Sequence, residues 1–182
     1  MHRNSINSIR RTTIILVALL LVTTIVAAQS KKEKLIADAN AAKAEFIKTD
    51  AKMAGLFQSA YGYAIFPNVG KGAIGVGGAA GNGVAYEQGA KVGSASLKQV
   101  TIGFQFGGQA YREVIFFEAK KDMDKFKENK IELSAQVSAV AAAAGASANA
   151  KYKEGVMVFT MAKGGLMYEA SVGGQKFKFE KD

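Results

Sequence analysis

The chain opens with a block of apolar residues before any periodic pattern appears. Residues 12–26 form an almost unbroken apolar run, and the preceding residues 1–11 carry three arginines and no acid. The small residues that end at Ala28 come just before Gln29. A basic start, a short apolar run and a small-residue end are typical of a secretory signal peptide, so we expect cleavage between Ala28 and Gln29. A retained membrane anchor is the alternative, but a spanning helix needs about 20 apolar residues.

Apolar and small residues recur at spacings of three and four from residue 31 to residue 59, with charged residues between them. This spacing predicts amphipathic helix. Thr49-Asp50 can cap the start of a new helix, so we expect two helices that meet there.

A period of two marks the next zone, residues 61–118. Val100 to Phe106 alternate with polar residues and glycines, which predicts a half-buried strand, and Val114–Phe117 are apolar on both faces, which predicts a central strand. Gly81-Asn82-Gly83 offer a turn between two short strands within residues 71–86.

A short helix is expected at residues 120–129, with Met123 and Phe126 facing inward and Asp122 facing solvent. The alternation over residues 131–139 predicts a strand that continues into the alanine-rich residues 141–150. Further strands are expected at residues 156–161, 166–172 and 176–179.

These elements predict an α+β fold. We expect an N-terminal amphipathic helix or helix pair packed on a curved, mostly antiparallel sheet, a barrel-like meander, with one further short helix. After the signal peptide, residues 1–28, the remaining residues 29–182 are expected to form a single domain.

The amino-acid composition excludes several kinds of catalytic and metal-binding site. The only histidine is His2, inside the predicted signal, and there is no cysteine, which excludes Ser-His-Asp and Cys-His catalysis and the usual zinc sites from the exported part. We therefore expect no enzyme, no metal and no cofactor. Gly70 to Gly75 match G-x-G-x-x-G, but the motif does not open a predicted helix, so a dinucleotide site is not expected.

The net charge is +9, and beyond the signal every basic residue except Arg112 is lysine. Lysine is a mobile point charge, whereas arginine suits bidentate recognition. The excess therefore fits diffuse attraction to an anionic surface better than reading of nucleic-acid bases. The alternative explanation of the positive charge is that the lysines keep the protein soluble.

Three separated blocks of the sequence resemble the SYLF-domain family. They are AYGYAIFPNVGKG at residues 60–72 with the glycines that follow, QVTIGFQFGGQ at 99–109, and FTMAKGGL at 159–166. The resemblance, which runs from about Lys34 to Phe179, implies a lipid-binding module. Lipid binding in eukaryotic members is attributed partly to an amphipathic N-terminal helix, whose counterpart by position is residues 31–46.

The resemblance and the export signal together predict a non-enzymatic protein of the periplasm or cell envelope that binds anionic membrane lipids. Actin, a partner of yeast relatives, is not expected for an exported bacterial member, and a protein partner is left open. The candidate lipid-binding residues are Lys31, Lys32, Lys34, Lys71 and Arg112. The candidate membrane-docking residues are Leu35, Phe46 and Phe57, which alternatively pack on the sheet.

Two other functions fit the same sequence. A small outer-membrane β-barrel is allowed by the size, the signal and the period-two strands. A structural or partner-binding envelope protein is the other alternative.

Overall fold

The computed structural model describes residues 29–74, 76–101, 109–133, 139–163, 172 and 174–182. The chain forms two compact units, Met1–Ile36 and Ala37–Asp182. The predicted signal peptide lies outside the described residues, so its cleavage site stays a prediction.

Two helices precede the sheet, as the spacing predicts. The first spans residues 29–49, and α2 spans Met53–Ser59. Asp50 lies between them and accepts a hydrogen bond from the backbone N–H of Lys52 at 3.1 Å, although the residue at the N-cap of α2 is Lys52.

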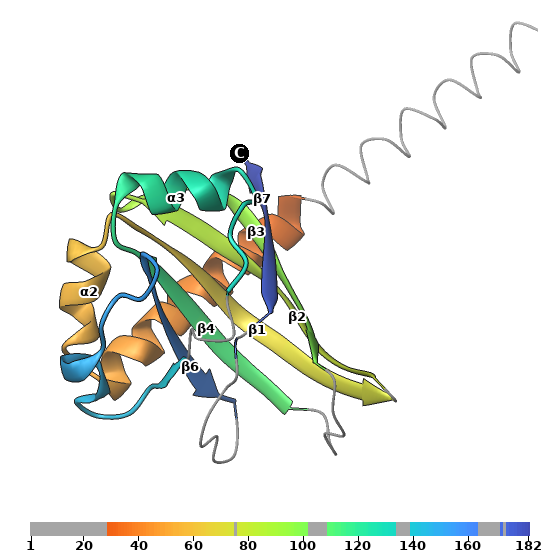
Figure 1. Cartoon of the computed structure of the whole chain (residues 1–182), viewed down its shortest axis with the longest axis horizontal. Helices are drawn as coiled ribbons and strands as arrows, with labels where there is room; N and C mark the ends of the chain where they lie inside the picture. The colour runs from red at the N-terminus through yellow and green to blue at the C-terminus, as the bar shows by residue number, and fades with distance from the viewer. Residues whose placement is uncertain (1–28, 75, 102–108, 134–138, 164–171, 173) are drawn as a thin grey trace, which may run out of the picture. The chain divides into compact units, whose positions relative to one another are not determined.

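A seven-stranded sheet forms the centre of the second unit, in the order β5-β6-β4-β1-β2-β3-β7 (Figure 1). All neighbouring strands are antiparallel except β5 and β6. The predicted α+β class with a mostly antiparallel sheet is confirmed. The strands are β1 Gly62–Ile74, β2 Val76–Glu87, β3 Ala90–Thr101, β4 Gln109–Phe117, β5 Val140–Ala141, β6 Val156–Ala162 and β7 Gln175–Lys181.

Both faces of the sheet are covered, which explains why the middle of β4 is apolar on both sides. Phe116 packs against Phe57 of α2, with ring centroids 4.9 Å apart. Its neighbour Phe117 points the other way and packs 4.8 Å from Phe126 of α3, Lys120–Lys127. All three of these β4 and α3 rings are fully buried, and the predicted central strand is confirmed.

The predicted turn at Gly81-Asn82-Gly83 is wrong, because these residues lie inside the long strand β2. They pair on one side with β1 and on the other with β3. A Cβ on Gly83 would lie 2.7 Å from the ring of Phe66, and one on Gly81 would lie 3.0 Å from a methyl group of Val69. These glycines therefore permit close packing rather than a turn.

The segment after α3 departs most from the prediction. Asp122 is buried, not exposed. Residues 141–150 form only the end of β5 and a short 3-10 helix, Ala146–Asn149, entered through Gly145 at φ 76°. An alanine-rich run carries little side-chain pattern to hold a register, and Gly145 adopts the left-handed conformation that leads into the 3-10 helix. The strands predicted at 102–106, 134–138 and 166–171 fall outside the described residues.

Candidate functional site

The three lysines predicted to contact lipid lie near the start of the helix over residues 29–49. Lys31, Lys32 and Lys34 are all exposed, within the first compact unit. On the same helix turn Gln29 donates a side-chain hydrogen bond to Glu33 at 3.3 Å. This turn therefore presents three ammonium groups and one carboxylate.

The three predicted membrane-docking residues separate into two environments. Leu35 is half-buried, whereas Phe46 is fully buried and Phe57 is 6% exposed. Phe57 packs edge-on against Tyr63 at 5.0 Å, and the ammonium of Lys43 lies 4.8 Å above its ring. Phe57 packs on Tyr63 and Phe116 of the sheet, and Phe46 is buried, so neither ring is exposed in this structure.

Lys71 and Arg112 lie on neighbouring strands. The backbone of Lys71 in β1 pairs with Ala79 and with Gln109, and its side chain lies outside the described part of the structure. Arg112 in β4 is half-buried, and its guanidinium lies 3.9 Å from the sulfur of Met161. No described contact brings the two side chains together.

A further set of lysines, which the sequence did not single out, meets on the outer face of β3 and β7. Lys98 and Lys176 are directly opposite each other in the antiparallel register, and Lys178 lies opposite Ser96. All three side chains are exposed. We call these three residues the lysine face. The K-x-K spacing at residues 176–178 shows that two lysines share a side, but only the strand register adds Lys98.

The counter-charges at the lysine face are weak. Lys176 lies 3.3 Å from Glu132, and Lys178 lies 2.7 Å from Glu180. In each pair both side chains are more than half exposed, so solvent and salt screen the attraction. The Lys178 contact lowers the pKa of Glu180. Lys98 has no ion-pair partner among the described residues.

A buried polar network occupies the opposite face of the same strands. The amide nitrogen of Gln175 donates to Glu113 at 3.0 Å and lies 3.4 Å from the hydroxyl of Tyr111 and 3.5 Å from the amide oxygen of Gln99. Burial, and then the charge of Glu113, raise the pKa of Tyr111. The network joins β3, β4 and β7 through side chains.

An open groove of about 630 Å³ lies beside the β2–β3 turn, lined by Glu87, Val92, Lys127, Phe179 and Lys181. The ammonium of Lys127 bridges Glu87 at 2.9 Å and Asp124 at 3.0 Å. The hydrogen bond to Glu87 is the main cause of the raised pKa of Lys127. Two carboxylates already neutralise the charge of Lys127. The groove therefore attracts an anion less strongly than the lysine face does.

Neither a metal cluster nor a membrane-spanning helix occurs in the described part of the chain. Its residues contain no group of three or more His, Cys, Asp or Glu side chains placed to hold a metal ion. None of its helices is long and apolar enough to cross a membrane.

Comparison with known proteins places the chain among relatives. A family model named Ysc84 and described as "Las17-binding protein actin regulator" matches residues 98–182, which include the second and third blocks noted above. The chain is also 33% identical over 130 residues to Beta cell expansion factor A of Aeromonas veronii. That alignment covers 70% of this chain and 49% of the relative, so the chain spans about half the relative's length. These matches show that the chain carries a domain of the Ysc84 (SYLF) family.

Proposed function

We propose that this protein is an exported, non-catalytic lipid-binding protein that associates with anionic phospholipid head groups on an envelope membrane. Three features support the proposal: the SYLF family domain, the signal-like start of the chain and the excess of lysine. Actin is not proposed as a partner, despite the family's description, because an exported protein would not meet it.

The lysine face is the observation that carries this proposal. Like charges directly opposite each other in an antiparallel pair destabilise a sheet, so the Lys98–Lys176 pair is unfavourable in the isolated protein. An anionic surface would relieve that repulsion. Lysines on an edge strand also block edge-to-edge aggregation, but that role does not require Lys98, which lies on the inner neighbour of β7.

Binding of this kind is electrostatic and additive over mobile cations. Each lysine close to an anionic membrane contributes about 1 kcal/mol, and the attraction is screened by salt over a Debye length of about 8–10 Å. Lys31, Lys32 and Lys34 would supply a second cationic group. Lys71 and Arg112 remain proposed contacts of lower rank, since Arg112 is already half-buried.

Catalysis is not proposed, and the reason is compositional. His2 is the only histidine and precedes the predicted cleavage site, and the chain has no cysteine. The buried carboxylate of Glu113 accepts a hydrogen bond from the side-chain amide of Gln175.

The test is co-sedimentation of the purified protein with vesicles. We expect binding to vesicles that contain phosphatidylglycerol, weak binding to phosphatidylcholine alone, and release as salt rises. The triple variant K98Q/K176Q/K178Q should lose at least tenfold in affinity, since three such lysines contribute about 3 kcal/mol in total. The charge-matched control K48Q/K52Q/K121Q changes three exposed lysines outside the lysine face.

Equal binding to the two kinds of vesicle would rule out the electrostatic mechanism. An equal loss in both triple variants would show that net charge, not the lysine face, governs association.

A further inference from the structure

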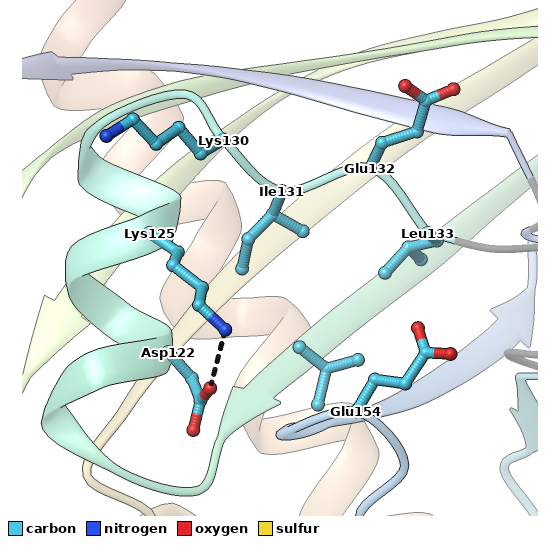
Figure 2. A pocket seen from close by; sticks show the side chains of 8 residues that line it. Asp122, Lys125, Lys130, Ile131, Glu132, Leu133 and Glu154 are labelled. Atoms are coloured by element: carbon cyan, nitrogen blue, oxygen red, sulfur yellow. Dashed lines mark ion pairs between the residues drawn. The ribbon is translucent and has the colours of Figure 1, made fainter.

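The lysines of the small pocket beside α3 are paired with carboxylates. Nζ of Lys125 lies 3.8 Å from the carboxylate of Asp122 on the same helix, as the dashed line in Figure 2 marks. Nζ of Lys130 lies 2.7 Å from Glu128. Because these two cations already have counter-charges, the pocket has little to attract an anion.

Two cations on the sheet, Arg112 and Lys163, are placed differently. Arg112 lies directly opposite Met161 in the register of β4 and β6, and its guanidinium lies 3.9 Å from the sulfur of Met161. A thioether is a weak acceptor, so the strong donors of the guanidinium stay available. Lys163 follows β6 directly and is exposed. Neither cation forms an ion pair with a carboxylate among the described residues.

The side chain of Lys163 reaches across β4. Its backbone N–H donates to the carbonyl of Ala110 at 2.9 Å, two residues before Arg112, while its ammonium donates to Oδ1 of Asn68 in β1. The side chain spans β4, because β4 lies between β6 and β1 in the sheet. Met161 and Lys163 are two residues apart along the chain, so Lys163 shares the face on which Arg112 lies opposite Met161.

A β-bulge in β1 brings Asn68 to the same place. The register of β1 against β4 shifts between Phe66 and Val69, so that Pro67 and Asn68 together oppose the single residue Arg112. A bulge of this kind re-aims side chains and is common beside functional sites. Asn68 is exposed, and its Oδ1 accepts the lysine contact, which leaves its amide nitrogen to donate to a ligand.

The strand positions next to these three residues on this face carry no charge. They alternate with buried residues, and all of them are exposed. They are Gly70 of β1, Ala80 and Asn82 of β2, and Ala110 of β4. Two cations therefore lie on an open part of the sheet without a neighbouring carboxylate in these strands.

We propose that Arg112, Lys163 and Asn68 form a binding site for a phosphomonoester group. The guanidinium would donate two parallel hydrogen bonds to phosphate oxygens, and the ammonium and the amide nitrogen would donate to the others. A phosphomonoester carries a charge of about −1.5 to −2 at pH 7, which matches two cations. A phosphodiester carries a single negative charge and would neutralise only one of them. The site therefore selects a monoester over a diester.

The phosphate site and the lysine face lie on the same face of the sheet. Lys98 is opposite Ala80, Ala80 is opposite Gly70, and Gly70 is opposite Ala110. Three strand spacings separate Lys98 from Ala110, a distance of about 14 Å. One anionic membrane would therefore meet both groups of cations. As a lipid site, selective for phosphatidic acid, this inference rests on the proposed function, and a soluble phosphomonoester is the other source of the same chemistry.

Co-sedimentation of the purified protein tests the selectivity. Vesicles that contain phosphatidic acid are compared with vesicles that contain phosphatidylglycerol, adjusted to equal zeta potential. We expect at least fivefold tighter binding to phosphatidic acid. R112K keeps the net charge but lacks the planar fork of arginine, so it should bind phosphatidylglycerol as the native protein does and lose the preference. K163Q should lower the preference at least threefold, whereas K48Q, which removes an exposed lysine of the first helix, should leave it unchanged.

Calorimetric titration with glycerol 3-phosphate separates the two sources of the phosphate. A preference for phosphatidic acid that R112K removes, without calorimetric binding of glycerol 3-phosphate, assigns the lipid head group as the ligand. Calorimetric binding that R112K weakens, without a preference between the vesicles, assigns a soluble phosphomonoester. Both results together would mean that the site accepts the group from either source.

Equal binding to the two kinds of vesicle, together with no binding of glycerol 3-phosphate, would overturn the phosphate site and leave the proposed function intact. A preference that survives in R112K, or an equal loss of preference in K48Q and K163Q, would also overturn it. A protein that binds glycerol 3-phosphate through Arg112 but neither kind of vesicle would keep the site and refute the proposed function.

Discussion

The carboxylate of Asp50 accepts a hydrogen bond of 2.8 Å from the backbone N–H of Ser147, a residue 97 positions further along the chain. Asp50 is 4% exposed and lies where the first helix ends. Ser147 belongs to the 3-10 helix that follows β5. This hydrogen bond therefore links the end of the first helix to the short 3-10 helix, a segment with little other regular structure.

Replacing Asp50 with alanine should destabilise the fold. A hydrogen bond to a charged group contributes about 1.5–3 kcal/mol, and the buried N–H of Ser147 would lose its acceptor. We expect the free energy of unfolding in urea to fall by about that amount. D38A, a change at a half-buried acid of the same helix, serves as control; an equal loss there would show that helix charge, not the Ser147 contact, is responsible.

Acid should remove the contribution of Asp50. The hydroxyl and the backbone N–H of Ser147 lower the pKa of Asp50 from its ordinary value of 3.8. Because the folded pKa lies below the unfolded one, the stabilisation is present above the unfolded pKa and is lost as pH falls through the folded pKa. The stability difference between the native protein and D50N should therefore be constant from neutral pH to about pH 5 and shrink below pH 4. A difference that grows on acidification would contradict this assignment.

Gly83 should tolerate no side chain, because its Cα faces the ring of Phe66. We expect G83A to cost about 1–3 kcal/mol, as overpacking of a filled core does. Gly70 is exposed in the neighbouring strand and has open space around its Cα, so G70A is the matched control and should change stability by less than about 0.5 kcal/mol. Equal melting temperatures for the two variants would show that the sheet relaxes at Gly83.

The glycines also show where prediction from sequence ends. The apolar run Val114–Phe117 predicts a strand within β4, the strands expected at 156–161 and 176–179 match β6 and β7, and helical spacing predicts both N-terminal helices and α3. From the sequence Gly83 reads as a turn residue, because a turn and a close approach favour the same residue. The sequence places Asp122 in solvent because charge usually lies outside, but in the structure the Asp122 carboxylate is buried against Gly155, a neighbour in space alone. The pairing of Lys98 with Lys176 likewise exists only through the register of β3 and β7.

Substitutions at Phe57 and Leu35 should distinguish a role in core packing from a role in membrane docking. F57A removes a ring that packs on Tyr63 and Phe116, so the free energy of unfolding should fall by about 3–5 kcal/mol. The milder F57L should keep the protein folded, with native affinity for phosphatidylglycerol vesicles. L35A should leave stability within about 1 kcal/mol of native and weaken vesicle binding. If F57L weakened binding as much as L35A does, Phe57 would have to leave the core at the membrane.

The lysines at the start of the first helix provide the last prediction. K31Q/K32Q/K34Q should weaken binding to phosphatidylglycerol vesicles by at least tenfold without changing the melting temperature, because all three side chains are exposed. The salt dependence of binding should also become shallower, since fewer cations face the lipid phosphates.

Combining this triple variant with K98Q/K176Q/K178Q gives a double-mutant cycle. If the helix lysines and the lysine face contact the same membrane independently, their losses in binding free energy should add to within about 0.5 kcal/mol. The combined variant could instead bind vesicles as tightly as the weaker-binding of the two triple variants. That result would mean that only one group of lysines contributes to binding. Such a result would confine the binding surface to that group, and the triple variants measured singly would identify which it is.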